Sequence, residues 1–325
     1  MLLKRIRANV IALALTPSFL LCTTQSEGQA DMKPPVTPER IASELTVIES
    51  AAARHATADE LGTLWAQLAS DYHDELDIPR AEEAYDHALK LLRGSVMERH
   101  NYAVALDGLG ALYLLKRQFS DSAICRRKAL AIFEAEGDRK NVLALHGNLA
   151  LSMLREGTYS EAEKEASEAI EGMAGQASAN DTQLATVFIT RSYARCFQHR
   201  CKDGLSDAQQ AVDIDRAYLR TNPLEAAASW TALGYMEWKT GDVAGADENM
   251  RRAFQILSEK SNLPYTGLLW ARIEAMMQYQ QFLNETHRKA EARQVGAEMA
   301  RLAREQMSVC GNCSVNVEAL SNALR

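Results

Sequence analysis

Two pairs of closely spaced cysteines are the residues whose types and spacing most directly suggest chemistry. Cys310 and Cys313, in CGNC, have the spacing of a thiol–disulfide exchange motif, which works when a helix N-terminus lowers the pKa of the first thiol. No βαβ pattern precedes this motif, so we favour a local disulfide or an unreactive pair over redox catalysis. Cys196 and Cys201 lie near an expected helix end and could also form a disulfide.

An acidic segment with one histidine, DYHDELD at residues 71–77, is the strongest sequence candidate for a metal site. Its ligand spacing matches no recognised site, so we expect a helix end and a turn with solvated side chains. The sequence has no HExxH, P-loop or G-x-S-x-G motif. We therefore predict a protein with no catalytic residues, no metal site and no cofactor.

The charge of the chain limits the class of partner. The formal net charge is −7, and the Lys and Arg residues alternate with Asp and Glu. A nucleic-acid-binding protein needs a concentrated basic stripe for the phosphate backbone. The sequence therefore argues against nucleic acid as a partner.

Residues 1–30 have the composition of a secretory signal peptide. Basic residues precede an apolar core at residues 8–22, and small residues at Gly28 and Ala30 predict cleavage after Ala30. The apolar run is too short to span a bilayer comfortably, so we expect an exported chain, periplasmic or secreted, without a membrane span. A lipid anchor at Cys22 fits less well, because Leu21 before it is bulky.

The remainder of the chain is typical of an all-α protein. Only 17 Gly and 7 Pro occur in 325 residues, and long proline-free stretches are rich in Ala, Leu, Glu, Arg and Gln. Alternating β-branched and aromatic residues are nearly absent, so we predict no strand. Thr37 and Pro38 are expected to begin the first helix.

A residue pattern recurs between residues 61 and 302. In its clear copies a large residue is followed by Leu, then Gly or Ala, then an aromatic, and thirteen residues after the Leu position comes a small residue that begins a series of alanines. The copies at Gly204 and Ala292 are more degenerate. These small anchors are spaced 40 to 46 residues apart and are Ala81, Ser122, Ala162, Gly204, Ala246 and Ala292. Small residues on a second helix allow it to approach its neighbours closely.

This pattern resembles the tetratricopeptide repeat (TPR), in its longer variety of about 42 residues, which is similar to that of kinesin light chains and of many bacterial proteins. The resemblance implies an all-α, right-handed superhelical solenoid of about six TPR-like helix–turn–helix repeats. We expect the array at 61–305, a capping helix within 31–60, and a C-terminal tail at 306–325.

The resemblance also implies a groove lined by the first helix of each repeat. Carried over position by position, the predicted peptide-contacting residues are Asn148, Leu151, Leu154, Arg155, Tyr193, Arg195, Tyr235 and Trp238. Asn148 stands where the family holds a peptide backbone, and Arg155 and Arg195 could meet an acidic group. Tyr235 and Trp238 could equally pack against the next repeat.

The function expected from the sequence is a non-catalytic scaffold or adaptor of the cell envelope that binds a protein or peptide partner of unknown identity in this groove. Two alternatives remain. One is a thiol–disulfide exchange protein that uses Cys310 and Cys313. The other is a cytosolic TPR regulator.

Overall fold

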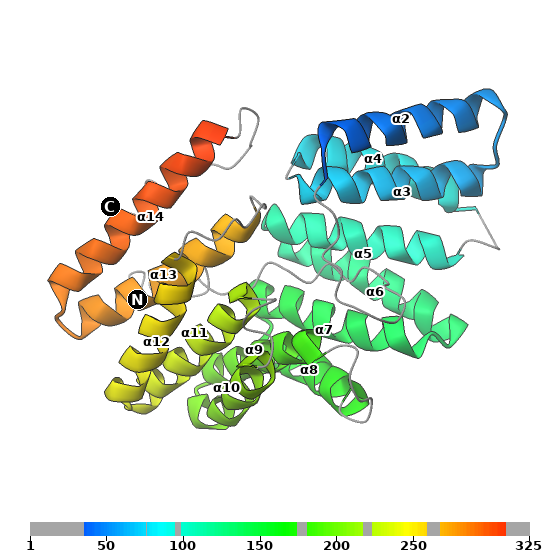
Figure 1. Cartoon of the computed structure of the whole chain (residues 1–325). Coiled ribbons are helices and arrows are strands. Elements are labelled where there is room, and N and C mark those ends of the chain that lie inside the picture. Colours follow the sequence, from blue (N-terminus) through cyan, green and yellow to red (C-terminus); the bar gives the residue numbers. More distant parts are fainter. Residues whose placement is uncertain are drawn as a thin grey trace, which may run out of the picture.

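The computed structural model describes residues 36–75, 77–94, 99–173, 181–216, 223–258 and 267–309, and every regular element in these ranges is an α-helix (Figure 1). The helices are α2 (Pro38–Ala53), α3 (Ala58–Asp74), α4 (Ile78–Leu92), α5 (Arg99–Leu115), α6 (Phe119–Glu136), α7 (Arg139–Glu156), α8 (Tyr159–Met173), α9 (Asp181–Phe197), α10 (Cys201–Asp215), α11 (Pro223–Thr240), α12 (Val243–Ser258), α13 (Gly267–Glu285) and α14 (Lys289–Val309). None of these helices combines the length and apolar character needed to cross a membrane.

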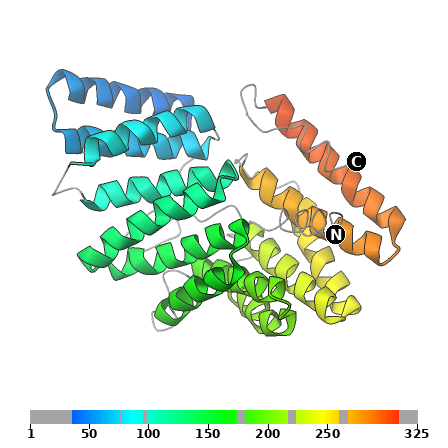
Figure 2. The same cartoon turned by 180° about the vertical axis from the view of Figure 1, so that it is seen from behind.

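From α3 to α14 the described helices pack in six consecutive pairs, which we call repeats 1 to 6. The first helix of each pair is an inner helix, and successive inner helices contact one another, as α7 does α9, α9 does α11 and α11 does α13. Figure 2 shows the pairs following one another around a curved array. The structure therefore confirms the predicted all-α solenoid and the number of repeats.

Local sequence signals set several helix ends. The Thr37 hydroxyl accepts a hydrogen bond from the backbone N–H of Arg40, and Pro38 occupies the first turn of α2, as predicted. Gly157 ends α7 with φ of 94°, a left-handed conformation that costs glycine little. The start of α2 and the turn between α7 and α8 are therefore fixed by local chemistry.

The small residues of the repeat pattern lie where helices approach most closely. Ala81, Ala162 and Ala246 are 0% exposed. A Cβ atom at Gly234 would lie 2.7 Å from Cγ of Met250, so α11 and α12 have no room there for a side chain. The alanines thus form the packed seam that the sequence predicts.

Candidate functional site

A continuous chain of aromatic rings runs through repeats 3 to 6, with most of its members on inner helices. Neighbouring ring centroids lie 5.0 to 6.3 Å apart, within the range of favourable aromatic contacts. We call this chain the aromatic ladder; its members, in order of contact, are Tyr159, Phe197, Tyr193, Tyr235, Trp238, Phe282, Tyr279 and Phe254.

The repeat register places much of the ladder. Tyr193 of α9 and Tyr235 of α11 are 42 residues apart, so they occupy equivalent positions on adjacent inner helices, and their rings lie 5.3 Å apart. Tyr193 and Tyr235 are each only 4% exposed, whereas Phe197 and Trp238 are half-buried. The ladder therefore has a buried centre and partly accessible members.

Two polar contacts join inner helices that are not neighbours in the array. Nη2 of Arg155, at the end of α7, lies 3.2 Å from Oε1 of Glu274 on α13, and the Tyr193 hydroxyl donates a 3.0 Å hydrogen bond to Oε1 of Gln278 on α13. Burial lowers the pKa of Arg155, and the charge of Glu274 opposes that shift. The array therefore curves enough for repeats 3 and 4 to touch repeat 6 directly.

Lys239 at the end of α11 is a half-buried cation that sequence reasoning missed. Its Nζ lies 3.2 Å from the ring centroid of Trp238 and 5.2 Å from that of Tyr235. Burial lowers the pKa of Lys239, and Glu285 opposes this shift. The repeat spacing could have pointed to Lys239. Arg155, Phe197 and Lys239 lie 42 residues apart in turn, so they occupy equivalent positions in three successive repeats.

The first three predicted groove residues are held inside the array. Asn148 is 3% exposed, and its Nδ2 donates a 3.2 Å hydrogen bond to Asp107 of α5. Its backbone oxygen accepts a 2.7 Å hydrogen bond from Arg126 of α6. Leu151 and Leu154 are 5% and 3% exposed. Asn148 therefore joins repeat 3 to repeat 2, while Leu151 and Leu154 are buried.

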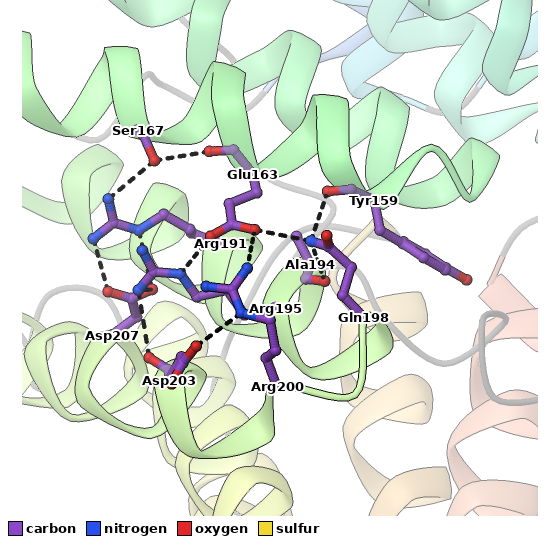
Figure 3. A network of polar contacts seen from close by, with 10 residues as sticks. All are labelled: Tyr159, Glu163, Ser167, Arg191, Ala194, Arg195, Gln198, Arg200, Asp203 and Asp207. Carbon is purple, nitrogen blue, oxygen red and sulfur yellow. Dashed lines mark hydrogen bonds and ion pairs between the residues drawn. The ribbon is translucent and has the colours of Figure 1, made fainter.

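Arg195 belongs to a network of ion pairs that joins α8, α9 and α10 (Figure 3). Its Nε lies 2.9 Å from Glu163 and its Nη1 lies 2.9 Å from Asp207. Asp207 also pairs with Arg191 at 2.8 Å, and Glu163 pairs with Arg200 at 2.9 Å. Arg195 is thus neutralised within the fold, as Arg155 is by Glu274.

Of the aromatic positions predicted for the groove, Tyr193 and Tyr235 are both buried among other rings, which for Tyr235 corresponds to the packing interpretation. Trp238 is packed against other rings and is also partly accessible. Its ring packs edge-on against Tyr235 and Phe282, with centroids 5.8 Å away in each case, yet it keeps part of its surface accessible.

The acidic segment at 71–77 differs from the expectation of solvated side chains. Helix α3 continues to Asp74, and its packing against α2 and α4 leaves Asp71 0% and His73 7% exposed. A side-chain nitrogen of Arg40 on α2 donates a 2.9 Å hydrogen bond to Asp71. Within the described ranges no group of three or more His, Cys, Asp or Glu side chains is arranged to hold a metal ion.

Cys196 and Cys201 form a disulfide between the end of α9 and the start of α10, as the sequence suggested. Cys125 of α6 is a buried free thiol. Cys310 and Cys313, like Cys22 and Ala30, lie outside the described residues.

Comparisons with known proteins identify solved structures of similar fold. No protein-family model and no curated protein matches the sequence. Among solved structures, the apo form of RapI matches with a TM-score of 0.69 and 12% identity, over 83% of this chain and 92% of that chain. NprR in complex with its cognate peptide NprX matches with a TM-score of 0.58 and 14% identity, over 83% and 79%.

A third match names the repeat. A putative kinesin light chain from Podosopora anserina with nearly identical TPR-like repeats matches with a TM-score of 0.52 and 16% identity, over 62% of this chain and 96% of that chain. Identities this low establish the architecture and leave the ligand open. The chain thus has the fold of tetratricopeptide-repeat proteins, as a solenoid of six long repeats in the described residues, with an aromatic ladder that lies mainly on its inner helices.

Proposed function

We propose that this protein is a non-catalytic adaptor that binds a peptide segment of a partner protein on the inner side of its TPR array. The observation that carries the proposal is the aromatic ladder, because its partly accessible rings offer apolar anchors on a rigid frame of paired helices. The match to NprR in complex with a peptide supports this choice among the functions of helical repeats.

Within this proposal the eight predicted positions have two roles. Trp238 contacts the peptide. The other positions are buried or paired and hold Trp238 and the inner helices in place; they are Asn148, Leu151, Leu154, Arg155, Tyr193, Arg195 and Tyr235.

Selection of peptides from a random display library tests the proposal, followed by calorimetric titration of the selected sequences. Trp238→Ala is expected to weaken their binding about tenfold or more, because a partly accessible aromatic anchor is lost. Ile124→Ala is the matched control, since Ile124 is 46% exposed on the outer helix α6. Failure to select any peptide, or equal binding by both variants, contradicts the proposed function.

We also propose that the adaptor acts after export, on the composition of residues 1–30 alone. Mass spectrometry of the protein from its native cell tests this location. A chain that begins at Asp31 supports cleavage after Ala30. A chain that begins at Met1 supports the cytosolic alternative, and one with a lipid-modified Cys22 supports membrane anchoring.

A further inference from the structure

The disulfide of repeat 4 spans a turn that other repeats form without one. His199 in this turn has φ of 64°, and the corresponding turns of repeats 2, 3, 5 and 6 each contain one residue with φ between 61° and 100°: Arg117, Gly157, Gly241 and His287. In these repeats the positions equivalent to Cys196 and Cys201 hold no cysteine; the pairs are Leu114 and Phe119, Leu154 and Tyr159, Trp238 and Val243, and Asn284 and Lys289. The disulfide therefore adds a property that the turn itself does not require.

The segment between the two cysteines contacts the preceding repeat (Figure 3). Nε2 of Gln198 donates a 2.9 Å hydrogen bond to Glu163 of α8, and Nη1 of Arg200 lies 2.9 Å from the same carboxylate. Nε2 of Gln198 also donates a 3.3 Å hydrogen bond to the backbone oxygen of Tyr159, and the Phe197 ring centroid lies 5.0 Å from that of Tyr159. The disulfide therefore closes a loop whose side chains join repeat 4 to repeat 3.

The two sulfur atoms of the disulfide lie in different surroundings. Cys196, near the end of α9, is 6% exposed, whereas Cys201 is half-buried and is the first residue of α10. Arg200 and Lys202 beside Cys201 are exposed, and no described side chain caps this end of α10. Cations and the N–H groups of a helix N-terminus stabilise a thiolate. A small thiol is therefore expected to react at Cys201 rather than at Cys196.

We propose that the disulfide between Cys196 and Cys201 is an exchange site for a small thiol of the glutathione type, and that its opening loosens the junction between repeats 3 and 4. The bond then controls how firmly the loop at the end of α9 holds the start of α8. This inference goes beyond the proposed peptide binding and does not depend on it.

The exchange proceeds in two steps. The thiolate of one small thiol attacks Sγ of Cys201, which forms a mixed disulfide and breaks the bond to Cys196; Cys196 leaves as a thiolate and takes up a proton. The thiolate of a second small thiol attacks the sulfur of the bound one, and Cys201 leaves as a thiolate. The protein disulfide gains two electrons, and the two small thiols are oxidised to their own disulfide. The protons that they lose go to Cys196 and to Cys201 or the solvent.

Reaction of the folded full chain with millimolar reduced glutathione tests the exchange. Free thiols are alkylated after an acid quench, and mass spectrometry of proteolytic peptides shows which cysteines have opened. We expect the bond between Cys196 and Cys201 to open without unfolding of the chain. The single variants Cys196→Ser and Cys201→Ser then compare the two thiols, and Cys201 is expected to react with oxidised glutathione about tenfold or more faster than Cys196.

Amide hydrogen exchange of the oxidised and the glutathione-reduced chain tests the structural consequence. After reduction we expect exchange about tenfold faster at residues 159–163 and 196–201, with no change in α3 and α4. The Cys196→Ser, Cys201→Ser double variant is the matched control. It should exchange like the reduced chain and show no response to glutathione, which separates this bond from the other cysteines. If the double variant does not fold, the two states of the wild type decide the result.

Three outcomes overturn the inference. A bond that glutathione opens only after the chain is unfolded in urea would have a purely structural role. Equal reaction rates of Cys196 and Cys201 in the single variants would contradict the attack at Cys201. Equal amide exchange at residues 159–163 before and after reduction would show that the junction between repeats 3 and 4 does not depend on the disulfide. Each of these outcomes leaves the selection of peptides, which tests the proposed function, unaffected.

Discussion

At the scale of single residues, burial decides which ionisable groups cost stability. Asp215, at the end of α10, is 1% exposed, and its carboxylate accepts a hydrogen bond from the hydroxyl of Ser229 on α11. Burial raises the pKa of Asp215 to about 7, although the bond from Ser229 opposes the shift. The folded protein therefore holds this carboxyl in its neutral form below that pH.

The sign of the resulting pH dependence follows from linkage. A folded-state pKa above the unfolded value means that the folded state binds more protons, so the free energy of unfolding falls as pH rises from about 4 to about 7. Asp215→Asn removes the titrating carboxyl and keeps an amide oxygen that can accept the hydrogen bond from Ser229. The wild type should lose free energy of unfolding as pH rises from 5 to 8, and the variant should not. We therefore expect the stability of the variant relative to the wild type to increase by about 2 kcal/mol over this interval.

Urea denaturation of both proteins at pH 5 and pH 8 measures this difference. Asp203→Asn is the matched control, since Asp203 is exposed in the first turn of the same helix. Parallel pH dependence of the wild type and Asp215→Asn would show that the buried carboxyl does not titrate as described.

At the scale of helices, the spaced alanines determine how closely the outer helices approach. Ala162 of α8 is 0% exposed, whereas Ala131 is exposed on α6. Ala162→Leu is expected to lower the free energy of unfolding by about 1–3 kcal/mol, because the seam has no room for a larger side chain. Chemical denaturation checks this against Ala131→Leu, and similar values for the two variants would contradict the close-packed seam.

The disulfide between Cys196 and Cys201 acts at the same scale, since it ties the end of α9 to the start of α10. Closing so short a loop in the unfolded chain is expected to contribute about 2 kcal/mol. Unfolding with and without dithiothreitol measures it, with the Cys196→Ser, Cys201→Ser double variant as control. The reductant should destabilise the wild type and leave the double variant unchanged; equal responses would exclude a stabilising role.

At the scale of the whole molecule, polar contacts from α7 and α9 to α13 join repeats 3 and 4 to repeat 6. The Arg155 side chain is 6% exposed and that of Glu274 is 14% exposed. Arg155→Ala leaves the Glu274 carboxylate partly buried without this cation, so we expect a loss of about 3 kcal/mol in the free energy of unfolding. We also expect a larger radius of gyration, as repeat 6 moves away from repeat 3.

Small-angle X-ray scattering measures the radius of gyration, and chemical denaturation measures the free energy of unfolding. Exchanging the charges, with Arg155→Glu and Glu274→Arg in one chain, should recover part of the stability and compactness that either single change removes. Arg216→Ala is a surface control, because Arg216 is exposed at the end of α10. If Arg155→Ala leaves the scattering curve unchanged, the curvature is set by packing alone.

Much of the fold could be predicted from the sequence because its signals are local and repeated. The small anchors recur in all six repeats, and the Leu positions thirteen residues before them recur in four, so together they indicate paired helices and the seam between them. Thr37 and Pro38 marked a helix start that the structure confirms. The candidate site was harder to predict. The resemblance identified positions on the inner helices, but it did not show which of those side chains are already in contact with other parts of the chain.

Sequence alone determined the helix pairs, the inner and outer helices and the alanine seam, because each follows from spacing within one or two repeats. Only the tertiary structure decided that Arg155 meets Glu274, 119 residues away, that Arg195 is neutralised in a network, and that Lys239 has aromatic rings rather than a carboxylate as its partners. The physical reason is that the overall curvature of the array is the sum of small rotations from each repeat to the next. No local pattern in the sequence shows where that sum brings distant helices together.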